Sequence, residues 1–95
     1  INSQIRKNAH PIATIDSIIH SIGKASLFSV VDAKAAFFSL PIREEDKDKS
    51  AFVTPCGKQF RFNRLPMGMS LSPAFYSSFL SRVLHGLEAA HPYLD

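Results

Sequence analysis

The chain has few of the residues that mark disulfide-stapled or membrane-spanning proteins. Cys56 is the only cysteine among 95 residues, which excludes an internal disulfide and is typical of a reducing compartment. No apolar run approaches the roughly 20 residues that a membrane-spanning helix needs, and no basic-then-apolar leader opens the sequence. We therefore expect an intracellular protein with no membrane partner.

Linkers, repeats and zinc-ligand patterns are also absent. The length suits one small domain with a single core, and 45% hydrophobic and 20% charged residues are ordinary for a globular chain. The net charge of +3 supports nucleic-acid binding only weakly. The histidines lack zinc-ligand spacing, so we predict no structural zinc. Because the first residue is Ile1 rather than Met, we expect the natural start to lie upstream.

Two segments have the apolar spacing of helices. Isoleucines recur at three- and four-residue steps from Ile15, with Thr14 as a cap and Gly23 as the end. A longer helix is predicted over Pro73–Leu87, with Ser72 as its N-cap. Its apolar stripe is expected to be core, and comprises Tyr76, Phe79, Leu80, Val83, Leu84 and Leu87.

Strands are predicted before and after a charged segment. The short apolar run Leu27–Val31 is typical of a buried strand. The mixed charges of Arg43–Lys49 favour a solvated helical turn. Ala51–Thr54 and Lys58–Asn63 then predict a hairpin with one buried face, which carries Phe60 and Phe62. In the turn between them, Cys56 is interpreted as a passive residue rather than a nucleophile.

Three features with potential chemistry follow one another along the chain. Asp32 closes the first predicted strand, with Phe37 and Phe38 close behind it. The loop Leu65–Pro73 leads into the long helix, and Tyr93-Leu94-Asp95 comes last. Each feature alone is a weak signal, because strand-end aspartates usually form turns and Pro/Gly loops before helices are common. Their order is what makes them informative.

Together these features resemble the reverse transcriptases of gypsy-type LTR retrotransposons and of retroviruses. Val31–Phe38 resembles motif A, Leu65–Pro73 resembles motif B, and Tyr93–Asp95 resembles the start of motif C, whose family form is Tyr, any residue, Asp, Asp. The likeness covers nearly the whole chain, and the remaining matches are Asn2, Lys7-Asn8, His10–Ile12, Ile15-Asp16, Ile42–Lys47 and Ala51–Pro55. It implies an α+β fold, in which residues 1–95 are a partial fingers–palm domain of a Pol polyprotein with an antiparallel palm sheet backed by helices.

The resemblance implies RNA-directed DNA polymerisation, in which a primer 3′-hydroxyl attacks the α-phosphate of a deoxynucleotide. Two magnesium ions about 3.5–4 Å apart stabilise both ends of such a displacement. The likeness makes Asp32 and Asp95 the catalytic carboxylates and metal ligands, with the backbone carbonyl of Ala33 as a further ligand. The implied partners are an RNA or DNA template–primer duplex, deoxynucleoside triphosphates, and the remaining fingers, thumb and ribonuclease H domains. The implied location is the cytoplasm, within virus-like particles.

The same resemblance assigns the substrate contacts. Ala33 and Phe37 belong to motif A, where the family places an aromatic under the sugar of the nucleotide, and Phe38 is expected to be core. Pro66 stiffens the motif B loop, Met67 offers apolar contact, and Gly68 lets the backbone approach the nucleotide. For the basic residues, phosphate contact and solvated surface both stay open, and these residues are Lys34, Arg61 and Arg64.

Motif A departs from the usual gypsy-type form. It reads Asp-Ala-Lys-Ala-Ala-Phe-Phe-Ser, which is nearer the retroviral form, although Ala35 lacks the carboxylate of that form. A second hypothesis is a decayed or domesticated palm kept as a non-catalytic nucleic-acid-binding or scaffold module. The residue that follows Asp95 in the parent gene would discriminate between the two. A third, an unrelated nucleic-acid-binding domain, predicts aromatics exposed on a sheet face. We expect the segment alone to be inactive.

Overall fold

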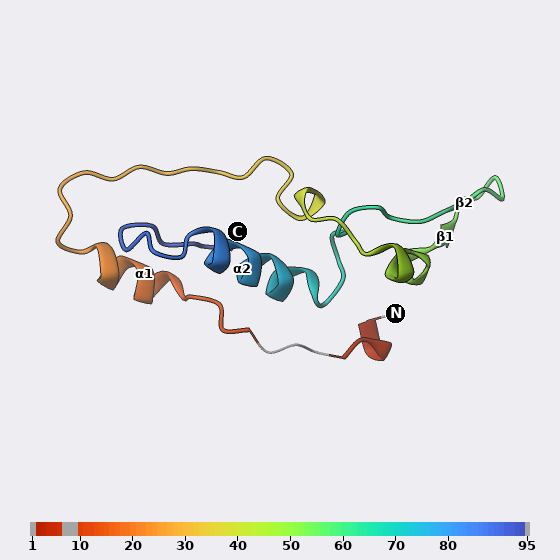
Figure 1. Cartoon of the computed structure of the whole chain (residues 1–95), viewed down its shortest axis with the longest axis horizontal. Helices are drawn as coiled ribbons and strands as arrows, with labels where there is room; N and C mark the ends of the chain where they lie inside the picture. Colours follow the sequence, from red (N-terminus) through yellow and green to blue (C-terminus); the bar gives the residue numbers. More distant parts are fainter. Residues whose placement is uncertain (1, 7–9, 95) are drawn as a thin grey trace.

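The computed structural model describes residues 2–6 and 10–94, which form an elongated body of 56 × 25 × 23 Å (Figure 1). Helices and a small antiparallel sheet are both present, as a mixed α and β class requires. The elements in chain order are the 3₁₀ helix η1 (Asn2–Gln4), α1 (Ile15–Ile22), the 3₁₀ helices η2 (Phe37–Ser39) and η3 (Glu44–Ser50), β1 (Phe52–Val53), β2 (Gln59–Phe60) and α2 (Ser72–Val83).

Helix α1 begins and ends where the sequence predicts. The Thr14 hydroxyl accepts a hydrogen bond from the backbone N–H of Ser17 at 3.2 Å, which satisfies a donor of the first turn. Gly23 follows the last turn with an ordinary right-handed φ of −59°. The helix therefore ends without needing the left-handed conformation for which glycine is usually chosen.

Helix α2 differs from its prediction at both ends. Ser72 is its first residue rather than its cap, and the Ser72 hydroxyl donates to the carbonyl of Pro66 at 2.7 Å. The helix ends at Val83 rather than Leu87, because a turn that contains Gly86 at φ 87° follows it. Of the predicted apolar stripe, Tyr76 is buried at 4% exposure, whereas Val83 and Leu87 are exposed. Tyr76 is therefore the one buried residue of the stripe, and Phe79, Leu80 and Leu84 are half-buried.

The predicted hairpin forms with shorter strands. Phe52 pairs with Phe60 and Val53 with Gln59 in antiparallel register, and Gly57 takes a φ of 83° in the turn. The expected burial of Phe60 is wrong, since this ring is 49% exposed and stacks only on its cross-strand neighbour Phe52. The sheet has just these two strands in the part of the chain that the structure describes, so no further strand extends its face over Phe60. Phe62, the other ring predicted to be buried, is half-buried.

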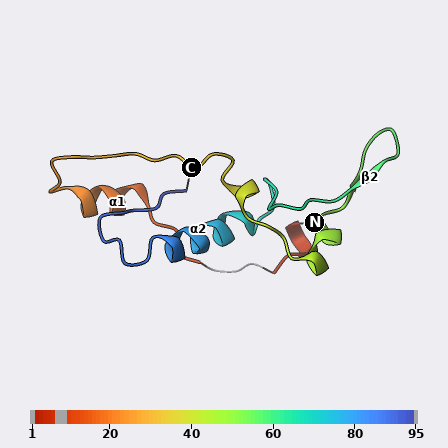
Figure 2. The same ribbon diagram turned by 45° about the horizontal axis from the view of Figure 1, so that its top comes forward.

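The predicted strand over Leu27–Val31 is wrong. This run is extended between α1 and η2 in both views, with no described segment paired to it (Figures 1 and 2). Leu27 is 90% exposed and Val30 and Val31 are each 94% exposed. A strand is stable only when its backbone groups find partners on a neighbouring strand. The apolar side chains of this run are typical of a segment that packs against other parts of a protein. No described residues pack over them here.

Among the residues that the structure describes, no helix is long and apolar enough to cross a membrane. The longest, α2, has 12 residues.

The exposed run generates a prediction for the isolated chain of residues 1–95. We expect it to be marginally folded and to self-associate, because an uncovered apolar backbone is a template for pairing. The double variant Val30→Lys/Val31→Lys should stay monomeric at higher concentration than the parent. Sedimentation velocity and thermal unfolding measure both properties. A parent chain that unfolds sharply and reversibly as a monomer would contradict the prediction.

Candidate functional site

The motif A segment is an exposed, extended stretch of chain followed by a tight turn. Asp32 and Ala33 are exposed and extended, and residues 34–36 turn into η2. Within this turn Ala35 has a φ of 51°, in the left-handed region that non-glycine residues seldom occupy. Such a conformation costs an L-residue about 1–2 kcal/mol. The turn that follows the candidate catalytic aspartate is therefore strained.

The two aromatics of motif A differ in burial, and Phe38 is not the core residue that was expected. Phe37 is half-buried and meets the ring of Tyr76 edge to face, with centroids 5.6 Å apart at 82°. Phe38, which was expected to be core, is 42% exposed. Consecutive residues of a 3₁₀ helix point about 120° apart, so only one ring of η2 can face α2. Phe37 is thus the residue that joins motif A to the helix.

The motif B loop is fixed at its base. Backbone hydrogen bonds run from Leu65 N–H to the Leu40 carbonyl at 2.9 Å and from Ile42 N–H to the Asn63 carbonyl at 3.0 Å, so the segment after η2 pairs with the start of the loop. Further along, Pro66 is buried and its carbonyl accepts the hydrogen bond from the buried Ser72 hydroxyl. The exit of motif A and the entry of motif B are therefore held together.

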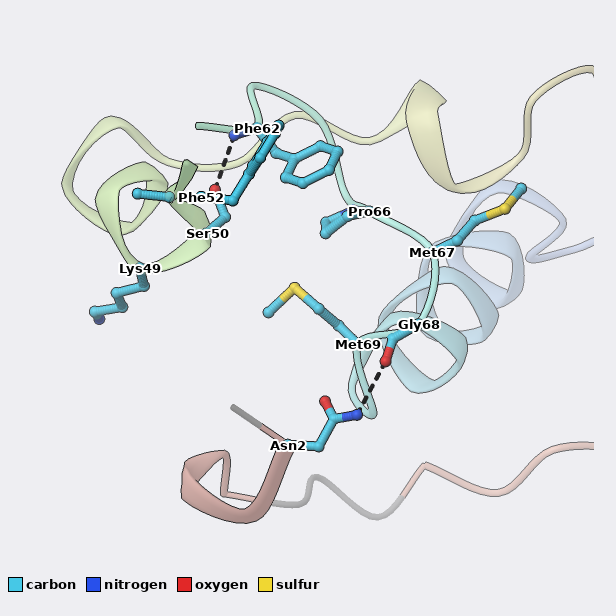
Figure 3. Close-up of a pocket in the computed structure, with 10 residues that line it drawn as sticks. Asn2, Lys49, Ser50, Phe52, Phe62, Pro66, Met67, Gly68 and Met69 are labelled. Atoms are coloured by element: carbon cyan, nitrogen blue, oxygen red, sulfur yellow. Dashed lines mark hydrogen bonds between the residues drawn. The ribbon is translucent and has the colours of Figure 1, made fainter. Parts of the chain in front are cut away.

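The tip of the loop has the conformation that was expected of a glycine position. Gly68 has a φ of 84°, and no atom lies within 4 Å of the place where a Cβ would be. Glycine is required there by backbone conformation and not by crowding. The neighbouring Met67 side chain is exposed, and Met67 is one of the residues that line the cavity beneath the loop (Figure 3). Both residues are accessible to a ligand.

An asparagine far away in sequence contacts this tip. The Asn2 side-chain amide donates to the carbonyl of Gly68 at 3.0 Å, and its oxygen accepts from the N–H of Ser70 at 3.0 Å (Figure 3). A cavity of about 460 Å³ lies between η1, η3 with β1, and the loop. Its lining includes Asn2, Lys49, Phe52, Phe62, Pro66 and Met69. Sequence reasoning missed the contact, because no local pattern links residues so far apart.

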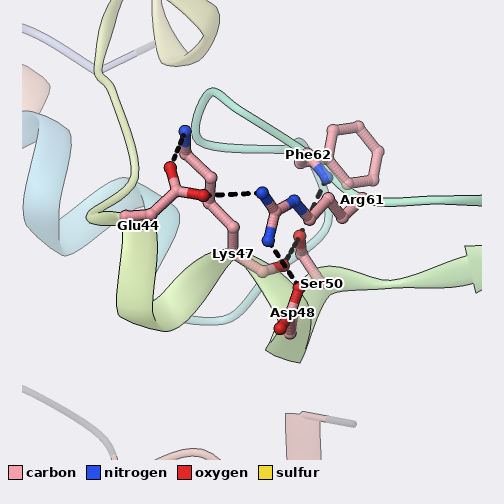
Figure 4. A network of polar contacts seen from close by, with 6 residues as sticks. All are labelled: Glu44, Lys47, Asp48, Ser50, Arg61 and Phe62. Carbon is pink, nitrogen blue, oxygen red and sulfur yellow. Dashed lines mark hydrogen bonds and ion pairs between the residues drawn. The ribbon is translucent and has the colours of Figure 1, made fainter.

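The charged segment is the solvated helical turn that its sequence predicts. It forms η3, and Arg61 binds two of its carboxylates, Glu44 at 2.6 Å and Asp48 at 2.6 Å (Figure 4). The hydrogen bond from Lys47 is the main reason that the pKa of Glu44 lies below its usual value. The hydrogen bond to Asp48 is the main reason that the pKa of Arg61 is raised. The Arg61 guanidinium is thus paired with two carboxylates of η3 rather than free to meet a phosphate.

The candidate metal ligands are only partly within the described structure. Asp95 lies outside the described residues, so its convergence with Asp32 stays a prediction, and the described residues contain no cluster of three or more Asp, Glu, His or Cys side chains. The preceding Tyr93 and Leu94 lie against Ile12 and α2, around a small cavity of about 80 Å³. The Asp32 carboxylate and Ala33 carbonyl are hard oxygen donors of the class that magnesium prefers, and magnesium commonly takes its other ligands from water and substrate phosphates.

Comparison with known proteins agrees with this arrangement of motifs. The whole chain, residues 1–95, matches the family described as reverse transcriptase (RNA-dependent DNA polymerase). It is 34% identical over 93% of its length to an enzymatic polyprotein of Cestrum yellow leaf curling virus, and 29% identical over 99% to a retrovirus-related Pol polyprotein from transposon 412 of Drosophila melanogaster. It is also 28% identical over 100% of its length to the transposon Tf2-7 polyprotein of Schizosaccharomyces pombe.

The chain belongs to the reverse transcriptase family. It spans 14%, 8% and 7% of the lengths of these three polyproteins. The chain therefore corresponds to one segment of much longer proteins.

The strained turn after Asp32 gives a prediction about stability. Ala35→Gly should raise the free energy of unfolding by about 0.5–1 kcal/mol, because glycine adopts a positive φ without the Cβ penalty. The matched control is Ala36→Gly, at a φ of −40°, which should lower stability by a similar amount through added freedom in the unfolded chain. Urea unfolding of the protein that contains this segment compares the two. Equal changes in unfolding free energy, in the same direction, for the two variants would contradict the assignment of strain to Ala35.

Proposed function

We propose that this chain is a palm segment of an RNA-directed DNA polymerase from a gypsy-type or retroviral Pol polyprotein. The parent enzyme adds deoxynucleotides to the 3′-hydroxyl of a primer annealed to an RNA or DNA template. One observation carries the proposal: the motif A and motif B residues of a reverse transcriptase family member meet on one helix. Phe37 packs on Tyr76 of α2, and Ser72 of the same helix holds the loop that presents Gly68.

The aspartates of this segment are the proposed metal-binding carboxylates. Asp32 and Asp95, with the backbone carbonyl of Ala33, hold two magnesium ions in the parent enzyme. When bound, the ions offset the charge that develops on the attacking and leaving oxygens of the phosphoryl transfer. The exposed carboxylate of Asp32 is reachable by a metal–triphosphate complex. A structure of the parent enzyme in which the Cα atoms of Asp32 and Asp95 lie on opposite faces of the palm sheet would contradict this arrangement.

The loop and the half-buried ring shape the nucleotide site. Gly68 leaves open space beside the backbone, so the sugar–phosphate part of a nucleotide approaches the peptide N–H groups closely. Pro66 is buried and fixes the base of the approach, whereas Met67 is exposed and offers an apolar contact. Phe37 is braced by Tyr76, and we assign its remaining surface to contact with the sugar. A braced ring excludes an added 2′-hydroxyl by bulk.

The uncovered run of residues 27–31 fits a segment of a larger polyprotein. We assign its partner strands to other parts of that polyprotein, which also supplies the remaining fingers, thumb and ribonuclease H domains. In that setting the template–primer duplex and the triphosphates are the ligands, and the virus-like particle in the cytoplasm is the location.

The carboxylate role is tested in the parent polyprotein by template-dependent primer extension. Asp32→Asn and Asp95→Asn should each lower kcat by at least about a hundredfold, because a metal-binding carboxylate contributes several kcal/mol to transition-state stabilisation. The control is Asp16→Asn, an exposed carboxylate in the first turn of α1, which should leave the rate unchanged. An inactive wild-type polyprotein that still binds template–primer would instead favour a non-catalytic palm.

Sugar selection gives a separate prediction. Phe37→Ala should raise ribonucleotide incorporation relative to deoxynucleotide incorporation by about tenfold or more, since a steric barrier of 1.4 kcal/mol corresponds to that factor. Phe38→Ala removes the same side chain from the neighbouring exposed position and should leave the ratio unchanged. The ratio of kcat/KM values is taken within each variant, so a loss of folded enzyme does not affect it. An unchanged ratio for Phe37→Ala would mean that the ring only packs.

A further inference from the structure

The contact between Asn2 and the motif B loop has no part in the chemistry described so far. We propose that Asn2 is a positioning residue for nucleotide binding, and this rests on the function proposed above. Its amide fixes the peptide groups around Gly68, so that the loop holds its nucleotide-binding conformation before substrate arrives. Figure 3 shows the Asn2 side chain reaching from η1 to the loop at Gly68.

The geometry uses both halves of the amide group. The Asn2 Nδ2 donates to the Gly68 carbonyl and the Oδ1 accepts from the Ser70 N–H, each at 3.0 Å. One planar group thus binds both sides of Met69, much as a neighbouring strand would. An asparagine side chain has a donor and an acceptor at that spacing, whereas aspartate lacks the donor and alanine lacks both. The contact is therefore specific to the residue type.

The loop needs a second anchor because its first lies at the base. The Ser72 hydroxyl holds the Pro66 carbonyl, and the Ser72 N–H donates to the Met69 carbonyl at 3.1 Å. Neither contact holds the Gly68 carbonyl. At the tip of the loop Gly68 is the residue with the greatest backbone freedom, and its φ of 84° is one of several conformations open to glycine. Asn2 restricts this freedom by holding the Gly68 carbonyl, and so orients the adjoining peptide groups.

A loop that is ordered in advance binds substrate more tightly than one that is ordered on binding. Loss of the Asn2 contact should therefore appear in nucleotide affinity more than in the chemical step. The expected signature is a higher KM for the triphosphate with nearly unchanged kcat. A contact that served only to hold the fold together would instead lower thermal stability and leave KM unchanged.

The experiment uses the parent polyprotein with a poly(rA)–oligo(dT) template–primer and dTTP. Asn2→Ala should raise KM for dTTP about tenfold. This is the factor expected if substrate binding must supply the free energy of roughly one net hydrogen bond to order the loop. Asn2→Asp keeps the size and the acceptor but turns an oxygen toward the Gly68 carbonyl, so KM should rise at least as much. Gln4→Ala, an exposed position of the same 3₁₀ helix, is the control and should match the wild type.

The outcomes separate this inference from the function on which it rests. A wild-type polyprotein without template-dependent extension would refute the polymerase function itself. An active wild type whose Asn2→Ala and Asn2→Asp variants keep the parental KM would overturn the positioning role, whatever happens to thermal stability. If Asn2→Ala unfolds, Asn2→Asp decides alone, because it preserves the volume of the side chain. A raised KM with faster hydrogen exchange in residues 66–70 supports the proposal.

Discussion

The arrangement depends on the burial of one face at the start of α2. Ser72 is fully buried and Tyr76 nearly so, and the spacing of one helical turn places both on the same face. The serine hydroxyl holds the motif B loop through Pro66, and the tyrosine ring holds Phe37 at the end of the motif A turn. One helical turn therefore sets the distance and orientation between the aspartate-bearing segment and the glycine loop. Burial elsewhere in the described residues is slight, so this junction has no substitute.

Sequence predicted the features that neighbouring residues determine. The Thr14 cap, the turn before Lys58 and the mixed-charge turn of η3 all rest on contacts within a few residues, and all three form. Features that need distant partners were less accessible. The run Leu27–Val31 has the composition of a strand, but composition does not supply the neighbour that a strand requires. Likewise Ser72 suits a cap by type, yet the Pro66 carbonyl is the partner that its hydroxyl finds.

The candidate site shows the same division. Resemblance to a family gave Asp32, Phe37 and Gly68 their expected roles from the order and type of the motif residues, and these roles stay predictions. It did not show which of the two motif A rings would pack on α2, since that choice depends on how η2 is rotated against the helix. Nor did it connect Asn2 with the loop. The residues of a motif can be compared with a family pattern, whereas a contact such as that of Asn2 depends only on reaching the right backbone group.

The network around Arg61 also determines where this segment carries its positive charge. It pairs Lys47 and Arg61 with Glu44 and Asp48. A second group of ion pairs on η3 joins Arg43 and Lys49 to Glu45 and Asp46. Each group is electrically neutral, so the net charge of +3 resides in the rest of the chain. The salt dependence of nucleic-acid binding should then be weaker than the total of basic residues suggests. Removing Arg61 would leave the Asp48 carboxylate without its ion pair, whereas Glu44 would keep Lys47. The added negative charge would repel phosphate and imitate a lost phosphate contact.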